Sequence, residues 1–229
     1  MMKIAFGFAL LAFVVAAVWL LISRSSTERP ELMPLAMATD IQGPALPAGA
    51  TASERENWFW QVVEASRRDA VSKEAQSARL SQLLGSYSPE EIEVFAAELD
   101  RLKDGAYSWD LWGAAYVIMG GCSDDGFADF RSWLISNGRE FFEAASKEPE
   151  TLAELIPQST TVAPEYEEFA YIAAETWAAK TGRSFSEMPR ATTQAYVDGP
   201  TGEPFEEDEA SLSQRYPALW RRFGNSPLG

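Results

Sequence analysis

One short stretch of the chain gathers residue types that can do chemistry. The octet Gly120 to Phe127, with the sequence GGCSDDGF, holds the single cysteine of the chain, two adjacent aspartates and three glycines. A cysteine near a helix N-terminus can have a lowered pKa, which favours the reactive thiolate. Carboxylates are the ligands that calcium and magnesium prefer. The same octet also fits a tight corner between two helices, so both interpretations have to be compared.

The chain lacks the partners that this chemistry normally needs. It contains no histidine, so Cys122 has no imidazole base and the commonest zinc ligand is missing. A single cysteine can form neither an internal disulfide nor a thiolate metal cluster. Asp124, Asp125 and Asp129 do not have the alternating spacing of a calcium loop. We therefore predict no catalytic residue, no cofactor and no metal ligand.

The structural interpretation assigns a role to nearly every residue of the octet. Gly120 and Gly121 can end a helix, because glycine adopts left-handed backbone angles without a clash at Cβ. Ser123 can then cap the next helix, and Asp124 and Asp125 would lie in its first turn, near the positive end of the helix dipole. The residue left without a structural role is Cys122. We favour the corner over the reactive site.

A wider set of residues around the octet remains a candidate binding surface. Asp110 and Arg131 could form a buried ion pair between the two helices, and Trp112 lies at helical spacing from its aromatic neighbours. The candidate binding or hallmark residues are Asp110, Trp112, Gly120, Gly121, Cys122, Ser123, Asp124, Asp125 and Arg131.

The elements that position these residues are predicted to be helices throughout. Apolar residues recur at spacings of three and four, and no run of alternating β-branched residues competes. Ser53 with Glu56 predicts a first capping box, and Ser88 with Glu91 a later one. The fold class is all-α: a compact bundle of about six to eight short helices behind one N-terminal transmembrane helix. Beyond the first helix, the predicted ranges are 72–84, a helix from Ser88 through Leu102, 109–119, 124–137, 139–147 and 164–180.

The N-terminus predicts a membrane anchor. Ile4 to Ile22 is a run of 19 residues without a charge, bounded by Lys3 and Arg24. As a helix it would be roughly 29 Å long, close to the ~30 Å hydrocarbon core of a bilayer. A cleaved signal peptide is the alternative, but its apolar region is usually shorter and the one small-x-small match, Ala36 to Ala38, lies far beyond the run. We therefore expect residues 1–23 to be retained.

The location and domain limits follow from this anchor. We expect a single-pass protein of the bacterial inner membrane. A very short N-terminal tail favours a periplasmic domain, whereas Arg24 and Arg29 argue for the opposite orientation. The predicted parts are the anchor 1–23, a flexible Pro/Ala-rich tether 24–52, a helical domain 53–190 and an acidic, partly irregular C-terminal extension 191–229.

Charge limits the choice of partner. The net charge is −15, and the first 52 residues hold three charges of each sign, so the excess lies in the globular part. Such a domain repels phosphate backbones, and we predict no nucleic-acid partner. The six acids of Asp198 to Glu209 are expected to form a solvated loop that could contact a basic partner. Most of the tryptophans are expected to be core rather than a ligand cage.

Three segments carry a resemblance to a known family. They are FWQVVEASR at Phe59 to Arg67, WDLWGAAYVIMGGCSDDGFADFRSWLISNGREFFEAA at Trp109 to Ala145, and EEFAYIAAETWAAKTG at Glu167 to Gly182. Over roughly Asn57 to Gly182 the chain resembles the bacterial domain-of-unknown-function family numbered 4240. The resemblance implies a shared fold, with the GGCSDDGF corner as a family hallmark, but no reaction. Members of that family usually look like soluble intracellular proteins without an anchor.

Three functions remain open from the sequence. The first is a membrane-tethered, non-catalytic acidic interaction module, an accessory subunit or adaptor of a larger membrane assembly. The second is an enzyme or small-ligand binder that uses the region of Asp110, Cys122, Asp124, Asp125 and Arg131. The third is an inhibitor or immunity-type protein with an acidic surface. The expected partners are the membrane, through residues 4–22, and another protein or membrane complex.

Overall fold

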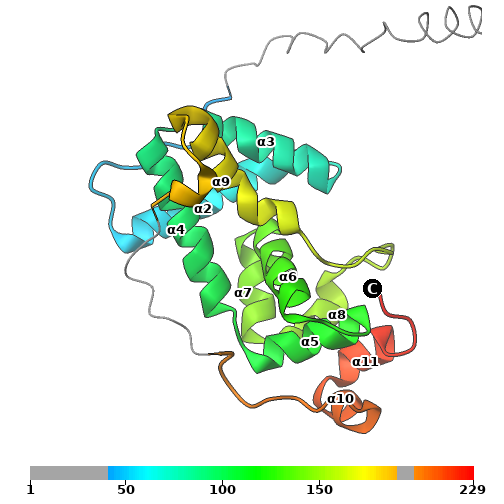
Figure 1. Cartoon of the computed structure of the whole chain (residues 1–229). Coiled ribbons are helices and arrows are strands. Elements are labelled where there is room, and N and C mark those ends of the chain that lie inside the picture. The colour runs from blue at the N-terminus through cyan, green and yellow to red at the C-terminus, as the bar shows by residue number, and fades with distance from the viewer. Residues whose placement is uncertain (1–40, 190–198) are drawn as a thin grey trace, which may run out of the picture. The chain divides into compact units, whose positions relative to one another are not determined.

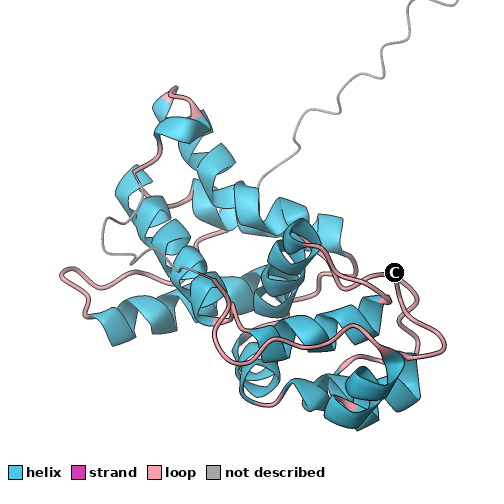
Figure 2. Cartoon of the chain, turned by 60° about the horizontal axis from the view of Figure 1, so that its bottom comes forward, coloured by secondary structure: helices cyan, strands magenta, loops and turns pink. Residues whose placement is uncertain are grey.

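The computed structural model describes residues 41–189 and 199–229, and its regular secondary structure is helical. The described part contains ten α-helices and no strand, apart from a single isolated parallel bridge between Ser108 and Thr201. The all-helical prediction is confirmed (Figure 2). The α-helices are α2 (Ala52–Arg67), α3 (Lys73–Gly85), α4 (Pro89–Gly105), α5 (Trp109–Met119), α6 (Asp124–Ser136), α7 (Arg139–Lys147), α8 (Leu152–Leu155), α9 (Glu167–Thr181), α10 (Glu209–Arg215) and α11 (Pro217–Phe223). Two short 3₁₀ segments, η1 (Pro149–Thr151) and η2 (Phe185–Glu187), complete the fold.

The helices form two groups that share α6. Figure 1 shows α2, α3, α4 and α9 together at one end of the domain, and α5, α8, α10 and α11 at the other. Helix α6 lies between them and packs on α4 and α9 as well as on α5 and α7. The corner between α5 and α6 therefore lies at the junction of the two groups.

The sequence predicts fewer helices than the structure contains. The helices that it misses are α8, α10 and α11, each of seven residues or fewer. Helices this short are not stable alone, and periodicity is hard to recognise over two turns. Here tertiary contacts support them: Leu152, Leu212 and Leu219 are buried.

Serine caps begin several of the helices, and those of Ser88 and Ser123 confirm the prediction. Ser72, Ser88 and Ser123 each accept a backbone N–H in the first turn of α3, α4 and α6. The predicted capping box of Ser53 and Glu56 is wrong. Thr51 and Glu54 form that box, two residues earlier.

Glu56 has a different role from the predicted cap. Its carboxylate lies 2.8 Å from Arg101 Nη2 and 3.3 Å from Arg139 Nη2, so it connects α2 to α4 and α7. A long-range ion pair of this kind leaves no local sequence signal.

Tryptophans form much of the core, as predicted. Trp58, Trp60, Trp112 and Trp177 are buried, while Trp109, Trp133 and Trp220 are partly buried against the core. The indole N–H of Trp58 donates to the Pro44 carbonyl and that of Trp177 to Glu93 Oε1, both at 2.8 Å. These side chains are structural, which removes the ligand-cage interpretation for them.

The stretch predicted as a tether, 24–52, is described from residue 41 onward, and there it contacts the domain. The Pro44 carbonyl also accepts the Tyr87 hydroxyl at 2.8 Å. A side chain on Gly43 would collide with the same Tyr87 hydroxyl, since a Cβ would lie 2.0 Å from it. Residues 41–50 are thus fixed to the domain by hydrogen bonds and close packing.

The C-terminal segment packs on α5. Gly113 leaves room for the Tyr216 ring, because a Cβ there would lie 2.2 Å from the tyrosine hydroxyl. At the end of the chain the Leu228 N–H donates to the Ile118 carbonyl at 2.8 Å. Residues 203–209 are largely exposed, in line with the solvated acidic loop expected from the sequence.

None of the described helices combines the length and apolar character that a membrane crossing needs. The predicted transmembrane helix, Ile4 to Ile22, lies outside the described residues.

Candidate functional site

The GGCSDDGF octet forms the corner between α5 and α6. Gly120 ends α5 in the left-handed conformation, with φ of 73°, and its N–H donates to the Tyr116 carbonyl. A side chain at this position would also approach Pro227 Cγ within 2.8 Å. Ser123 Oγ accepts the Gly126 N–H at 3.1 Å and caps α6. The predicted structural roles of Gly120 and Ser123 are confirmed.

Three further corner residues follow the predicted geometry. Gly121 has a backbone φ of 143°, a value that residues with a side chain rarely adopt. Asp124 and Asp125 lie in the first turn of α6 and are exposed. Carboxylates at that position stabilise the helix by interacting with its dipole.

Trp112 connects the corner to the core. Its indole N–H donates to the Cys122 carbonyl at 2.9 Å, and its side chain is 9% exposed. The ring stacks between two others, with centroids 5.2 Å from Trp109 and 5.0 Å from Phe127. Trp112 therefore holds the backbone of the corner against both α5 and α6.

Cys122 is a half-buried thiol in acidic surroundings. Burial raises its pKa to about 12, and the carboxylate of Glu165 adds to this rise. The Trp112 hydrogen bond and the Arg131 charge lower the pKa by smaller amounts. The thiol consequently stays protonated at neutral pH, which is the opposite of what nucleophilic catalysis requires.

The suggested ion pair between Asp110 and Arg131 does not form. Asp110 Oδ1 lies 3.2 Å from Arg215 Nε, and the Asp110 backbone carbonyl accepts the Tyr216 hydroxyl at 3.0 Å. Asp110 therefore holds α10 and α11 on α5. Its partner lies 105 residues away in the chain, so local sequence could not reveal it.

Arg131 is buried and binds the end of α4 instead. Its Nη1 donates to the Lys103 carbonyl at 2.8 Å. The guanidinium carbon lies 4.5 Å from the centroid of the Tyr107 ring and 5.0 Å from that of Phe127, which are cation–π distances. Burial lowers the pKa of Arg131, although nearby acids oppose the change. Asp110 and Arg131, which the sequence suggested as part of one enzyme-like site, therefore make separate structural contacts, with Arg215 and with the end of α4.

A metal site at the corner is not supported by the geometry. Within the described residues, no three carboxylates or thiols lie close enough together to hold a metal ion. Asp129, the third acid of the suggested set, lines a groove on the side of α6 that faces α9.

This groove is a concave surface that is rich in charged side chains. It has a volume of about 650 Å³ and lies between α3, α6 and α9. Six carboxylates line it, against one lysine; we call it the acidic groove. Its residues are Lys73, Glu74, Ser77, Asp129, Ala163, Glu165, Tyr166, Glu167, Glu168 and Glu175.

The single lysine of the acidic groove is occupied by backbone acceptors. Lys73 Nζ donates to the Glu165 carbonyl and lies over the Tyr166 ring at 5.7 Å. Tyr166 in turn shares a hydrogen bond of 2.7 Å with Ser77 and donates to the Lys73 carbonyl. The floor of the groove is thus a fixed framework that joins α3 to the start of α9.

The carboxylates of the groove are not neutralised by salt bridges. The salt bridges of the described residues use eight pairs of side chains, and no groove carboxylate belongs to any of them. Burial raises the pKa of Asp129, and the charges of Glu167, Glu165 and Asp125 raise it further against the opposing effect of Lys103. The negative charges of the acidic groove are therefore close enough to raise the pKa of one another's carboxyl groups, as seen at Asp129.

Glu165 joins the acidic groove to the corner. A Cβ placed on Gly126 would lie 3.2 Å from Glu165 Oε1 and 3.8 Å from Cys122 Sγ. The carboxylate therefore lies over the first turn of α6, beside the cysteine. The groove and the corner form one continuous acidic surface.

Sequence reasoning identified the corner but not the groove. The signal for part of it was present: Glu165, Glu167 and Glu168 surround Tyr166 in the run EYEE. A charge run alone indicates a solvated face, and only packing shows that Glu74 of α3 and Asp129 of α6 join it.

The comparison with protein families gives one match, which covers α2 to α9. The model described as "Protein of unknown function (DUF4240)" matches residues 55–179. The chain belongs to the DUF4240 family. The resemblance seen in the sequence is thereby confirmed, and the DUF4240 region contains both the corner and the acidic groove. No curated protein and no solved structure matches the chain.

Proposed function

We propose that this DUF4240 protein is a membrane-tethered, non-catalytic interaction module whose acidic groove binds a lysine- and arginine-rich segment of a partner protein. The observation that carries the proposal is the set of groove carboxylates that lack salt bridges. Such carboxylates gain more from an incoming cation than carboxylates that are already paired, because no existing pair has to be broken.

The anchor is part of the same proposal and rests on the sequence. The 19 uncharged residues from Ile4 to Ile22 would hold the domain at the bacterial inner membrane, with the domain on the periplasmic side. A tethered domain meets a membrane-bound partner at a high effective concentration, so a weak electrostatic contact is sufficient. This fits an accessory subunit or adaptor of a larger membrane assembly.

The alternative of an enzyme at the corner has less support. A protonated thiol at Cys122 and the separation of Asp110 from Arg131 leave no nucleophile with a base beside it. An inhibitor or immunity-type protein would use the acidic groove in the same way, with a basic enzyme as its target.

A titration with a basic peptide tests the groove directly. The full-length protein in detergent is titrated with a fluorescent peptide of lysine and arginine residues, and binding is followed by anisotropy. The groove variant carries Glu167→Gln, Glu168→Gln and Glu175→Gln, which are exposed positions on α9. The matched control carries Glu203→Gln, Glu206→Gln and Glu209→Gln in the exposed C-terminal loop and the start of α10.

Both variants change the net charge by the same amount, so a difference between them reports position. We expect the groove variant to bind about tenfold more weakly than wild type, a loss of ~1.4 kcal/mol, and the control to bind as wild type does. Wild-type binding should weaken as salt is raised, because salt screens charge pairs. Equal weakening of both variants would mean that net charge alone binds the peptide, and the groove proposal would be wrong.

A further inference from the structure

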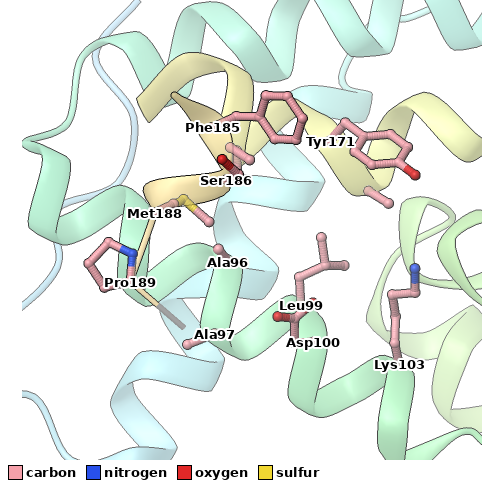
Figure 3. Close-up of a pocket in the computed structure, with 13 residues that line it drawn as sticks. Ala96, Ala97, Leu99, Asp100, Lys103, Tyr171, Phe185, Ser186, Met188 and Pro189 are labelled. Atoms are coloured by element: carbon pink, nitrogen blue, oxygen red, sulfur yellow. The ribbon is translucent and has the colours of Figure 1, made fainter. Parts of the chain in front are cut away.

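Two cavities other than the acidic groove differ in what their walls offer to a ligand. The smaller cavity, of about 310 Å³, lies between α4 and α9, and Figure 3 shows Tyr171 and Lys103 at one end of it and Met188 and Pro189 at the other. None of its described lining residues has a buried side-chain nitrogen or oxygen without a hydrogen-bond partner. Its walls therefore point to no particular ligand.

The larger cavity lies between α2 and α7, and we call it the α2–α7 cavity. Its volume of about 1200 Å³ is slightly above the usual range for small-molecule sites, ~300–1,000 Å³. The segment 42–44 and Leu155 of α8 complete its walls. It shares no lining residue with the acidic groove, so the two surfaces can be tested independently.

Trp60 lines the α2–α7 cavity and carries an unused hydrogen-bond donor. The residue is 3% exposed, and its indole N–H donates to no acceptor among the described residues. The indole N–H groups of Trp58, Trp112 and Trp177 all have an acceptor within the fold. Buried polar groups rarely lack a partner, because an unmade hydrogen bond costs stability. The Trp60 N–H is therefore a donor for which a bound ligand can supply the acceptor.

Two further polar side chains of the wall have no partner of their own. Gln61 and Arg68 are exposed, and their side chains form no hydrogen bond and no ion pair with a described residue. Exposed side chains of this kind change rotamer within nanoseconds. A ligand can therefore reach the shielded Trp60 N–H by moving part of the wall, at little cost to the fold.

The charges of the wall leave one cation without a counter-ion. Arg67 forms an ion pair with Glu64 at 3.0 Å, and Arg139 is paired with glutamates that lie outside the wall. Glu140 lies in the first turn of α7, where the helix dipole stabilises its carboxylate. Arg68 remains for an incoming anion, and a guanidinium suits a carboxylate because two parallel hydrogen bonds can form.

The start of α7 adds positive potential to the same cavity. Its N-cap residue, Gly138, provides no side-chain cap, so the N–H groups of the first turn carry the positive end of the helix dipole. The ion pair of Glu64 and Arg67 packs against this end, since a Cβ on Gly138 would lie 2.1 Å from Glu64 Oε1 and 2.3 Å from Arg67 Nη1. One internal carboxylate thus already faces the helix start, and Trp60 and Arg68 are the groups left for a ligand.

We propose that the α2–α7 cavity is a binding site for a small organic carboxylate that carries an apolar group. A carboxylate oxygen accepts the Trp60 N–H, and the Arg68 guanidinium binds the same carboxylate. The apolar group packs on the side chains of Pro44, Phe141 and Leu155, which line the cavity.

A titration followed by nuclear magnetic resonance tests this site. Phenylacetate is the probe; phenylacetamide has the same shape without the charge, and inorganic phosphate has charge without the apolar group. The full-length protein in detergent is labelled with ¹⁵N, and the Trp60 indole signal is identified by its absence from Trp60→Phe. We expect phenylacetate to move the Trp60 proton signal downfield, as a new hydrogen bond does. Phenylacetamide and phosphate should each bind about tenfold more weakly, since each lacks one of the two contacts.

A pair of arginine variants separates position from net charge. Arg68→Gln removes the unpaired guanidinium, and Arg221→Gln makes the same change in charge at an exposed position in the last turn of α11. Arg68→Gln should weaken phenylacetate binding about tenfold, whereas Arg221→Gln should bind as wild type does.

Four results would overturn the proposal. No saturable binding of phenylacetate, or a Trp60 signal that is unchanged at saturation, would exclude the cavity as its site. Equal weakening by Arg68→Gln and Arg221→Gln would mean that net charge alone attracts the anion. Phosphate that binds as tightly as phenylacetate would exclude a role for the apolar group.

Discussion

At the scale of single residues, Trp112 and Cys122 are the positions that best test whether the α5–α6 corner has a structural role. They are joined by one hydrogen bond, from the indole N–H to the Cys122 carbonyl, and the Trp112 ring also stacks on Phe127. Trp112 contacts the rings of Tyr107, Trp109 and Phe127, whereas the Cys122 side chain is only partly buried and its thiol makes a long hydrogen bond of 3.6 Å to the Ser123 carbonyl. The two side chains should therefore respond very differently to truncation.

Trp112→Ala should destabilise the domain by ~3–5 kcal/mol, as expected for removal of a large buried aromatic. The loss includes the stacking on Trp109 and Phe127 and leaves the Cys122 carbonyl without its donor. Denaturant melts measure it, with Trp109→Ala as the control, because Trp109 is only partly buried and should cost less. An unchanged midpoint for Trp112→Ala would mean that the ring contributes little to folding and is available for binding.

The Cys122 thiol should react slowly with alkylating reagents at neutral pH. Its pKa is raised from the ordinary value to about 12, so the folded protein contains less thiolate than the unfolded protein at any pH below that value. Alkylation rates measured from pH 7 to 10 should rise with pH, and at each pH denatured protein should react faster. Rapid labelling of the folded protein at pH 7 would contradict the protonated thiol.

At the scale of elements, the corner depends on a helix stop followed by a cap. The stop uses the left-handed backbone of Gly120, and the cap uses the Ser123 hydroxyl. Both are determined by residues adjacent in the chain, which explains why the sequence predicts them. The same holds for the serine cap of α4.

Ser123→Ala should lower stability by about 1 kcal/mol, the usual cost of losing an N-cap. Ser53→Ala is the matched control, because Ser53 lies inside the first turn of α2 and is not its cap, so the variant should melt as wild type does. Gly120→Val should cost more than Ser123→Ala, since valine disfavours φ of 73° and its Cβ would collide with Pro227. A Gly120→Val protein with wild-type stability would show that the corner tolerates side chains and is not a tight joint.

What the sequence does not predict are the contacts between distant elements. Asp110 binds Arg215 rather than Arg131, and Glu56 binds Arg101 and Arg139 rather than capping α2. Each of these choices depends on how the helices cross, and neither periodicity nor capping rules contain that information. The acidic groove escaped prediction for the same reason, because α3, α6 and α9 each supply part of it.

At the scale of the whole molecule, an apolar N-terminal sequence precedes a strongly acidic domain. The net charge of −15 lies beyond residue 52, and part of it is concentrated in the acidic groove, whose carboxylates form no salt bridge with any residue that the structure describes. Such a surface favours cationic partners and repels phosphate-rich ones.

The anchor should remain attached in the mature protein. The apolar run of 19 residues is longer than the apolar region of most signal peptides. The nearest match to a small-x-small cleavage site lies well beyond the run. Intact-mass measurement of protein extracted from membranes should give a chain that still contains residues 1–23. A species that begins at Thr39 would show that the segment is a cleaved signal.

The central claim is that the acidic groove binds a partner and the corner supports the fold. A quantitative pull-down from solubilised membranes tests it most directly, with wild-type protein, Cys122→Ala, and the variant carrying Glu167→Gln, Glu168→Gln and Glu175→Gln compared at equal melting temperature. We predict that the Cys122→Ala protein retains the captured partner and that the groove variant loses it. Loss of the partner by Cys122→Ala, with retention by the groove variant, would contradict the account and make the GGCSDDGF corner the functional site.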